Sequence, residues 1–160
     1  MKKFIALISL FVFAMSLTAC MSLDSYLNNT VEPTKSDLLI SAMGEFTTEE
    51  HYRYGWWQDG ATYSKYTYKS ADLNNDYLSL VTESDITDIK FKVSDFEFWV
   101  TSSKDDEKDK TLYENYDFDI SIIDTNDYWF IEYDEVDAKD FELFICDTET
   151  KVLYSFNYSI

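Results

Sequence analysis

Four short apolar runs, separated by acidic links, fill the last third of this chain and constrain its fold more than any other feature. Each run is rich in aromatic and β-branched residues, which favour strands. The links are four to seven residues long, and strands joined by such short links pair antiparallel. We therefore expect four strands of an antiparallel sheet, at residues 118–123, 128–133, 141–146 and 152–158.

A hairpin is predicted earlier in the chain. The dipeptide Asp59-Gly60 is a strong hairpin turn signal. Before it, aromatic residues alternate with other residues from position 52 to position 56, and after it residues 62–69 are rich in Tyr and Thr. Both patterns are typical of strands.

The middle of the chain also alternates between apolar and polar residues. We interpret residues 77–82 as a strand. Alternation then runs through residues 89–93 and returns in the opposite phase through residues 96–100. Because a shift of one residue moves side chains to the other face of a sheet, we expect two strands with a bulge or a turn at residues 94–95.

One short helix is expected before the strands, over residues 37–44, with Ser36 as its N-cap and Gly44 as its stop. With about eight or nine strands and little helix, the predicted fold is all-β. An antiparallel β-sandwich is the favoured architecture, and a lipocalin-like β-barrel is the alternative. The predicted layout has a single acidic β domain at residues 37–160.

The N-terminus has the pattern of a targeting signal. Lys2 and Lys3 precede an apolar run of about eleven residues that ends at Ala14, which is too short to span a bilayer as a helix. The tetrapeptide Leu-Thr-Ala-Cys follows at residues 17–20, and the whole arrangement resembles the signal of bacterial lipoproteins. An ordinary secretory signal is the alternative, but it would put the large Leu17 where small residues are preferred.

The resemblance implies that residues 1–19 are removed as a signal peptide and that Cys20 carries a diacylglycerol group and an N-acyl chain. Stable membrane anchoring takes at least two acyl chains. Residues 20–36 are polar and contain the only proline, so we interpret them as a lipid-attached flexible tether. The resemblance thus implies a lipid-anchored protein of the bacterial cell envelope. Because Met21 follows Cys20 where Asp would direct retention in the inner membrane, the outer membrane is favoured if the organism has two.

The acidic balance of the mature chain disfavours one class of partner. Two of the 13 basic residues lie in the signal, so 11 remain against 31 acidic residues, and the formal charge is −20. A nucleic-acid partner requires clustered Lys and Arg, so none is predicted. We interpret the surface as hydrated and acidic, with a site for a cation or a basic partner as the alternative.

Residues for nucleophilic catalysis are scarce. His51 is the only histidine, and Cys146 is the only cysteine left once Cys20 carries lipid. Cys146 lies in an apolar run, so we expect a small buried side chain. No G-x-S-x-G motif occurs, and the three glycines are too far apart for a phosphate loop. The chain is predicted not to be an enzyme. A carboxylate-based hydrolase stays open as an alternative, for which a cleft with two acids would be the evidence.

One loop has the spacing of a calcium site. Oxygen-bearing side chains at Asp72, Asn74 and Asp76, with Glu83 in the twelfth place, match the EF-hand pattern. Tyr77 occupies the place where that loop needs Gly, and the flanks have the pattern of strands. A polar hairpin turn is therefore the favoured interpretation and a weak calcium site is the alternative. No other cofactor is predicted.

The predicted hairpin is dense in aromatic residues, with seven between positions 52 and 68. Core packing and cross-strand pairing explain most of them. Those that are exposed could stack on a sugar ring or on another flat apolar ligand. The candidate ligand-binding residues are Trp56, Trp57, Tyr63 and Tyr66.

The sequence Gly55-Trp56-Trp57 is similar to the G-x-W motif at the first strand of lipocalins, and residues 128–129 and 151–154 are similar in rhythm to the late strands of that family. The resemblance implies a barrel that carries an apolar ligand. Lipocalins usually cover this Trp with a late arginine, which has no counterpart here because Arg53 is the only arginine. The C-terminal helix of the family is not predicted either.

Together these features predict a non-enzymatic, lipid-anchored protein of the cell envelope. Its acidic, aromatic-rich β domain is expected to bind a protein, a glycan or a small ligand. The alternatives are a lipocalin-like carrier of an apolar ligand and, with less support, a carboxylate-based hydrolase.

Overall fold

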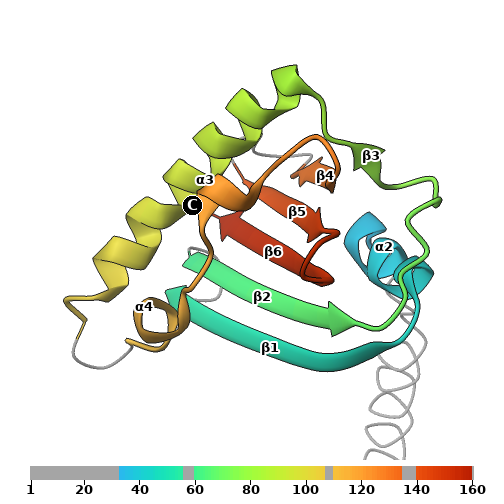
Figure 1. Ribbon diagram of the computed structural model, residues 1–160. Coiled ribbons are helices and arrows are strands. Elements are labelled where there is room, and N and C mark those ends of the chain that lie inside the picture. Colours follow the sequence, from blue (N-terminus) through green and yellow to red (C-terminus); the bar gives the residue numbers. More distant parts are fainter. Residues whose placement is uncertain (1–32, 56–59, 107–109, 135–139, 160) are drawn as a thin grey trace, which may run out of the picture. The chain divides into compact units, whose positions relative to one another are not determined.

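Six strands form one antiparallel sheet, and helices lie against both of its faces (Figure 1). The computed structural model describes residues 33–55, 60–106, 110–134 and 140–159. The strands, in their order across the sheet, are β1 (Phe46–Gly55), β2 (Gly60–Tyr68), β6 (Val152–Ser159), β5 (Phe141–Asp147), β4 (Tyr128–Tyr133) and β3 (Ser79–Leu80). The predicted signal peptide, Cys20 and nearly all of the tether lie outside the described residues.

The sheet joins two segments that are far apart in sequence. β1 and β2 form the predicted hairpin, with Gly55 opposite Gly60. β4, β5 and β6 form an antiparallel meander, which confirms three of the four predicted C-terminal strands. β6 also pairs with β2, so the hairpin and the meander become one sheet. The remaining prediction, a strand at residues 118–123, is wrong. These residues contain a 3-10 turn at Ile120–Ile122, which the Asp119 carboxylate caps.

The long helix α3 (Glu83–Ser103) replaces the two strands expected at residues 89–93 and 96–100. It begins with a capping box. The Thr82 hydroxyl accepts a hydrogen bond from the backbone N–H of Asp85, and the Asp85 carboxylate accepts one from the backbone N–H of Thr82. These two bonds satisfy donors that a helix N-terminus otherwise leaves open.

The apolar spacing of α3 explains why an alternating pattern folds as a helix. The buried residues are separated by four, three and four positions, which is the period of a helix, and they are Ile89, Val93, Phe96 and Val100. The apparent change of phase at residues 94–95 is therefore part of one helical stripe, and the strand prediction is wrong here.

The short helix α2 (Lys35–Met43) confirms the predicted helix at the start of the domain. Its N-cap is Thr34, two residues before the predicted Ser36. The Thr34 hydroxyl accepts a hydrogen bond from the backbone N–H of Asp37, and the Asp37 carboxylate accepts one from the backbone N–H of Thr34. The helix ends at Gly44, whose φ of 101° favours glycine.

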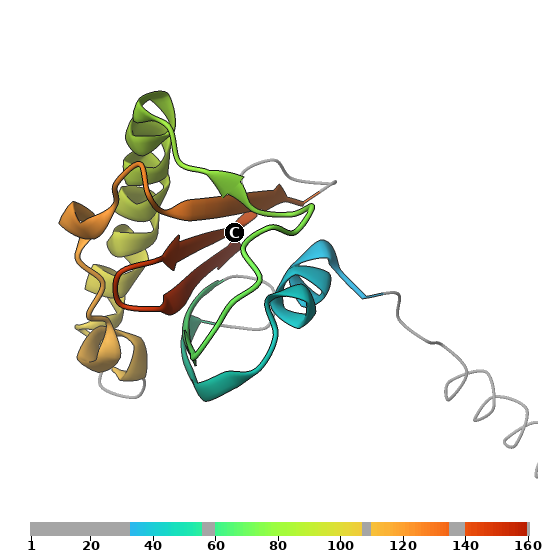
Figure 2. The same cartoon turned by 45° about the vertical axis from the view of Figure 1, so that its right-hand side comes forward.

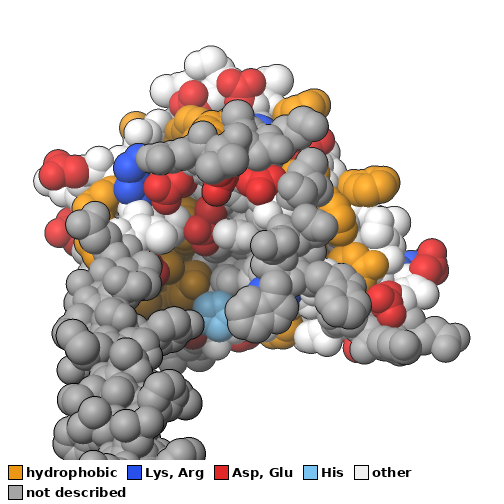
Figure 3. All heavy atoms as spheres, turned by 180° about the vertical axis from the view of Figure 1, so that it is seen from behind, with side chains coloured by type: hydrophobic (Ala, Val, Ile, Leu, Met, Phe, Trp, Pro, Cys, Tyr) orange, Lys and Arg blue, Asp and Glu red, His pale blue; other side chains and the backbone are white. Residues whose placement is uncertain are grey.

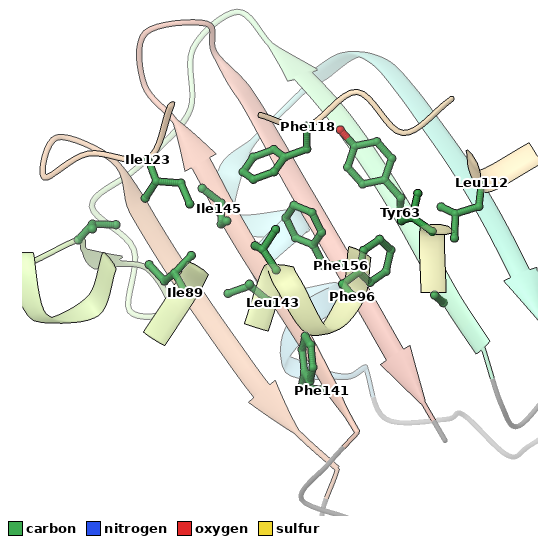
Figure 4. Packing of buried hydrophobic residues seen from close by; sticks show 14 residues of the cluster. Tyr63, Ile89, Phe96, Leu112, Phe118, Ile123, Phe141, Leu143, Ile145 and Phe156 are labelled. Atoms are coloured by element: carbon green, nitrogen blue, oxygen red, sulfur yellow. The ribbon is translucent and has the colours of Figure 1, made fainter. Parts of the chain in front are cut away.

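Helices pack a core on each face of the sheet, and Figure 2 shows α2 and α3 on opposite sides. On the α3 face, the rings of Phe96 and Phe156 lie 5.4 Å apart beside the buried Tyr63 (Figure 4). On the α2 face, Leu39 packs in a cluster that includes Phe144. A second short helix, α4 (Thr111–Asn115), follows α3.

The fold is therefore mostly β but not all-β. The described residues form one six-stranded sheet with β1 and β3 at its edges, so the sheet is open and does not close into the alternative barrel. Helices, instead of a second sheet, cover its faces. The predicted eight or nine strands are reduced to six because residues 89–100 and 118–123 contain helical turns.

No helix among the described residues is long and apolar enough to span a bilayer.

Alanine substitution of Phe96 and of Phe98 distinguishes helix from strand. A strand would place both rings on one face, whereas α3 buries Phe96 and exposes Phe98. Phe96→Ala should lower the free energy of unfolding by about 3–5 kcal/mol. Phe98→Ala should change it by about 0.5 kcal/mol or less. The measurement is urea unfolding followed by circular dichroism, and equal losses in the two variants would contradict the helix.

Candidate functional site

A groove lies on the sheet face that α2 covers only in part. Its volume is about 560 Å³, and its walls come from β1, β2, β4, β5 and β6, together with Thr34 before α2. Acidic side chains gather on this side of the molecule (Figure 3). The acidic residues that line the groove are Glu132, Asp134, Asp140 and Glu142.

Five polar residues line the groove at matching positions on five neighbouring strands. Thr62 of β2 lies between Arg53 of β1 and Asn157 of β6. Glu142 of β5 lies between Asn157 and Glu132 of β4. Residues directly opposite each other have Cβ atoms about 4.5–5.5 Å apart and point to the same face of the sheet. We call these five residues the polar row.

Two carboxylates, Glu132 and Glu142, end the polar row side by side. The Glu142 carboxylate accepts a hydrogen bond from the Ser155 hydroxyl at 3.1 Å, and the Glu132 carboxylate accepts one from the Ser36 hydroxyl at 3.2 Å. Burial raises the pKa of Glu142, and the charge of Glu132 raises it further. Neighbouring polar groups, among them the Ser155 hydroxyl, oppose this increase only in part. Glu142 therefore keeps its proton to a higher pH than an exposed glutamate does.

The next row of the same face is polar on three strands only. His51, Ser64 and Ser155 lie opposite one another on β1, β2 and β6. The row continues into Phe144 of β5 and Phe130 of β4, which belong to the core under α2. The polar part of the face therefore ends where the core under α2 begins.

His51 and Cys146 do not form a catalytic pair. His51 lies on the edge strand β1, with its Nδ1 atom 2.9 Å from the Ser64 hydroxyl. Cys146 is fully buried on β5, with its Sγ atom 3.0 Å from the Tyr68 hydroxyl, which agrees with its predicted role as a buried side chain. Burial raises the pKa of the Cys146 thiol to about 11, so the thiol is protonated at neutral pH and is a poor nucleophile.

The aromatic candidates do not gather on one exposed surface in the described part of the chain. Tyr63 is fully buried in the core under α3, and Tyr66 is buried in the core on the opposite face. Both rings therefore pack inside the domain and do not face a ligand. Trp56 and Trp57 lie outside the described residues.

The predicted calcium loop folds as a turn that uses its own oxygens. The Asp72 carboxylate accepts a hydrogen bond from the backbone N–H of Asn74 at 3.1 Å, and the Asn75 side-chain oxygen accepts two backbone hydrogen bonds. Across the described ranges, no three or more His, Cys, Asp or Glu residues are grouped so that they could hold a metal ion. The four predicted ligands are thus not assembled as a metal site: Asp72, Asn74, Asp76 and Glu83.

The polar row was not predictable as a unit, although two of its members carry a signal. Glu132 and Glu142 each interrupt an otherwise apolar run, at residues 128–133 and 141–146. An acidic residue inside such a run marks the polar face of a strand. Which strands lie side by side is decided only by the sheet order.

Comparisons with known proteins add no relative, since no protein-family model matches the chain and no curated protein or solved structure is significantly similar to it. The functional argument therefore depends on the residues themselves.

Replacing Glu142 by Gln should change how stability depends on pH. A carboxyl group whose pKa is raised on folding contributes its full stability below its unfolded pKa, and this is lost as the pH rises through the folded pKa. Because Gln stays neutral, Glu142→Gln should melt above the wild type at pH 7.5, by an amount on the order of a few degrees. The two should melt alike near pH 4.

Melting temperatures followed by circular dichroism at the two pH values measure this difference. Glu114→Gln, at an exposed position of α4, is the matched control. Its melting temperature should differ between pH 4 and pH 7.5 by the same amount as that of the wild type. A Glu142→Gln variant that is less stable than the wild type at pH 7.5 would show that the folded domain favours the ionised carboxylate.

Proposed function

We propose that this protein is a non-enzymatic, lipid-anchored component of the bacterial cell envelope. In this proposal, the polar row in the groove binds a ligand that carries an amine or guanidinium group. The resemblance of residues 1–20 to a lipoprotein signal supports the location. The observation that carries the binding function is the polar row itself, because the strand register brings five polar side chains into one groove.

The charge of the groove favours a cationic ligand. Glu132 and Glu142 provide acceptors at one end of the polar row, and Arg53 lies at its other end. The Nζ atom of Lys35 lies 3.9 Å from the Glu132 carboxylate, but Lys35 is mostly exposed, and such a pair contributes little. The negative charge of the whole mature chain also raises the local concentration of cations. An ammonium or guanidinium group would pair with the two carboxylates.

The structure gives less support to the other predicted ligands. Of the four residues predicted to stack on a sugar ring, Tyr63 and Tyr66 are buried, and Trp56 and Trp57 lie outside the described residues. A lipocalin-like carrier needs an enclosed cavity, whereas the described sheet is open and its two apolar areas pack against helices. A basic segment of another protein, or a small amine, is the ligand class that fits the groove.

A carboxylate-based hydrolase is the second candidate, because the groove holds two neighbouring acids and burial raises the pKa of one of them. Neighbouring carboxyl groups, one of them with a raised pKa, are an arrangement that general acid and base catalysis uses. Glu142 would be the acid and Glu132 the base or nucleophile. Cleavage of a bound ligand by the wild type, but not by Glu142→Gln, would favour this candidate over simple binding.

Membrane attachment should depend on Cys20. Cys20→Ala should abolish incorporation of labelled palmitate and should release the protein from the membrane fraction, since the acyl chains provide the attachment. Cys146→Ala is the matched control, because its thiol is buried, and it should stay labelled and membrane-bound. Retention of Cys20→Ala in the membrane fraction would contradict the anchor.

Ligand binding should depend on Glu132 and Glu142. We expect detergent-solubilised full-length protein to bind trilysine in isothermal titration calorimetry, and triglycine or a neutral trisaccharide much more weakly. The Glu132→Gln, Glu142→Gln double variant should bind trilysine at least about tenfold more weakly, because it loses two charge-assisted contacts. Added salt should weaken wild-type binding.

The matched control for this titration neutralises two acids away from the groove. Glu83→Gln with Glu114→Gln, on α3 and α4, changes the net charge equally and should leave trilysine binding nearly unchanged. Equal losses in both double variants would mean that trilysine responds to the overall charge and not to the groove. If the trisaccharide binds more tightly than trilysine, the proposal of a cationic ligand is wrong and the ligand is a glycan.

A further inference from the structure

The polar row carries charges of opposite sign at its two ends. Arg53 lies at the β1 end, and Glu132 and Glu142 lie at the end formed by β4 and β5. Arg53 is exposed, and among the described residues that line the groove it is the only basic one. A ligand that is cationic along its whole length would therefore meet a like charge at Arg53. The groove favours a ligand whose two ends carry opposite charges.

The two ends of the polar row are too far apart for one charged group to contact both. Three strand-to-strand steps separate β1 from β5, because β2 and β6 lie between them. Neighbouring strands lie about 4.7–4.9 Å apart, so the backbones at Arg53 and Glu142 are separated by about 14 Å. A charge-assisted hydrogen bond is only about 2.7–2.9 Å long. The ligand must therefore bring an acidic group to Arg53 and a separate cationic group to the two glutamates.

Each end of the polar row matches one terminus of a peptide. The guanidinium group of Arg53 holds its donors in a fixed fork, which binds a carboxylate through two parallel hydrogen bonds. The carboxylates of Glu132 and Glu142 belong to residues that lie opposite each other on paired strands, and they accept hydrogen bonds from an ammonium group. A free C-terminus is a carboxylate and a free N-terminus is an ammonium group.

The middle of the polar row suits the backbone of such a peptide. Thr62 supplies a hydroxyl and Asn157 a side-chain amide, and each of these groups can both donate and accept hydrogen bonds. A peptide unit offers one donor and one acceptor. An extended chain rises about 3.3 Å per residue, so three or four residues span about 10–13 Å. The long side chains at the two ends of the row can bridge the remaining distance.

We propose that the groove binds a short peptide with free termini, about three or four residues long, in one orientation. Its C-terminal carboxylate pairs with Arg53, and its N-terminal ammonium group pairs with Glu132 and Glu142. This inference rests on the proposed binding of a cation at the two glutamates, and it adds the second charged group that the ligand carries. An internal basic segment of a protein has no terminal carboxylate and would bring only cations to the groove.

Trilysine and trilysine amide test whether the ligand needs a carboxylate. The amide lacks the C-terminal carboxylate and is therefore the more positive of the two peptides. If the groove responded to positive charge alone, the amide would bind more tightly. Because the amide loses the contact with Arg53, we expect detergent-solubilised full-length protein to bind it at least about fivefold more weakly than trilysine in isothermal titration calorimetry.

Variants of Arg53 test where the carboxylate binds. Arg53→Gln should bind trilysine at least about fivefold more weakly than the wild type does, and trilysine amide at least as tightly. Arg53→Lys keeps the charge but not the planar fork, so its affinity for trilysine should lie between those of Arg53→Gln and the wild type. Lys110→Gln, at an exposed position outside the groove, is the matched control for the lost charge and should bind both peptides as the wild type does.

The outcomes separate this inference from the proposed cation site. Suppose that the Glu132→Gln, Glu142→Gln variant loses trilysine binding, but that the wild type binds the amide as tightly as trilysine or that Arg53→Gln binds trilysine normally. The cation site then stands and the peptide with free termini is wrong. If the wild type binds neither peptide, or if the double variant binds both normally, the proposed function is wrong and this inference is wrong with it.

Discussion

The pairing of β2 with β6 is the interaction on which the rest of the structure depends. It joins residues 60–67 to residues 152–159, the longest sequence separation between paired strands of the sheet. Tyr63 and Phe156 lie opposite each other across this seam, both fully buried, with their rings 5.7 Å apart. Phe96 of α3 packs on the same pair, so the helix covers the seam and holds the hairpin to the meander.

The same seam builds the groove. Arg53 and Thr62 belong to the hairpin, whereas Asn157, Glu142 and Glu132 belong to the meander. Without β2 beside β6, the polar row would be two unconnected fragments. Next to the seam, burial alone would raise the pKa of Asp117, but hydrogen bonds from Lys65 and Tyr63 outweigh it and lower the pKa overall. The buried Tyr63 hydroxyl thus has a charged acceptor at 2.9 Å, which offsets the cost of burying it.

Sequence patterns predicted the strands with strong local signals and failed where two periods compete. The hairpin, three late strands and the first helix were predictable because turn residues and helix stops are local. Residues 89–93 have the alternation of a strand, yet the capping box at Thr82 and Asp85 and the four-three-four spacing of the buried residues both indicate a helix. Length also favours the helix, because it buries one continuous stripe over 21 residues.

The candidate site was less predictable than the fold, because it depends on strand order. Glu132 and Glu142 are each one polar residue on a strand, and only the pairing of β4 with β5 makes them neighbours. The density of aromatic residues in the sequence instead predicted a ligand site at Trp56, Trp57, Tyr63 and Tyr66, of which the structure describes the two tyrosines. Aromatic side chains also bury a large apolar area in the core of a domain. Here Tyr63 and Tyr66 are core residues and do not face a ligand.

The groove and helix α3 lie on opposite sides of the sheet, and strand alternation is the reason. Along β5, Leu143 belongs to the core under α3, while its neighbour Glu142 lines the groove. On β6, Phe156 and Asn157 divide in the same way. The outward face of α3 is separated from the groove by the helix, its core and the sheet.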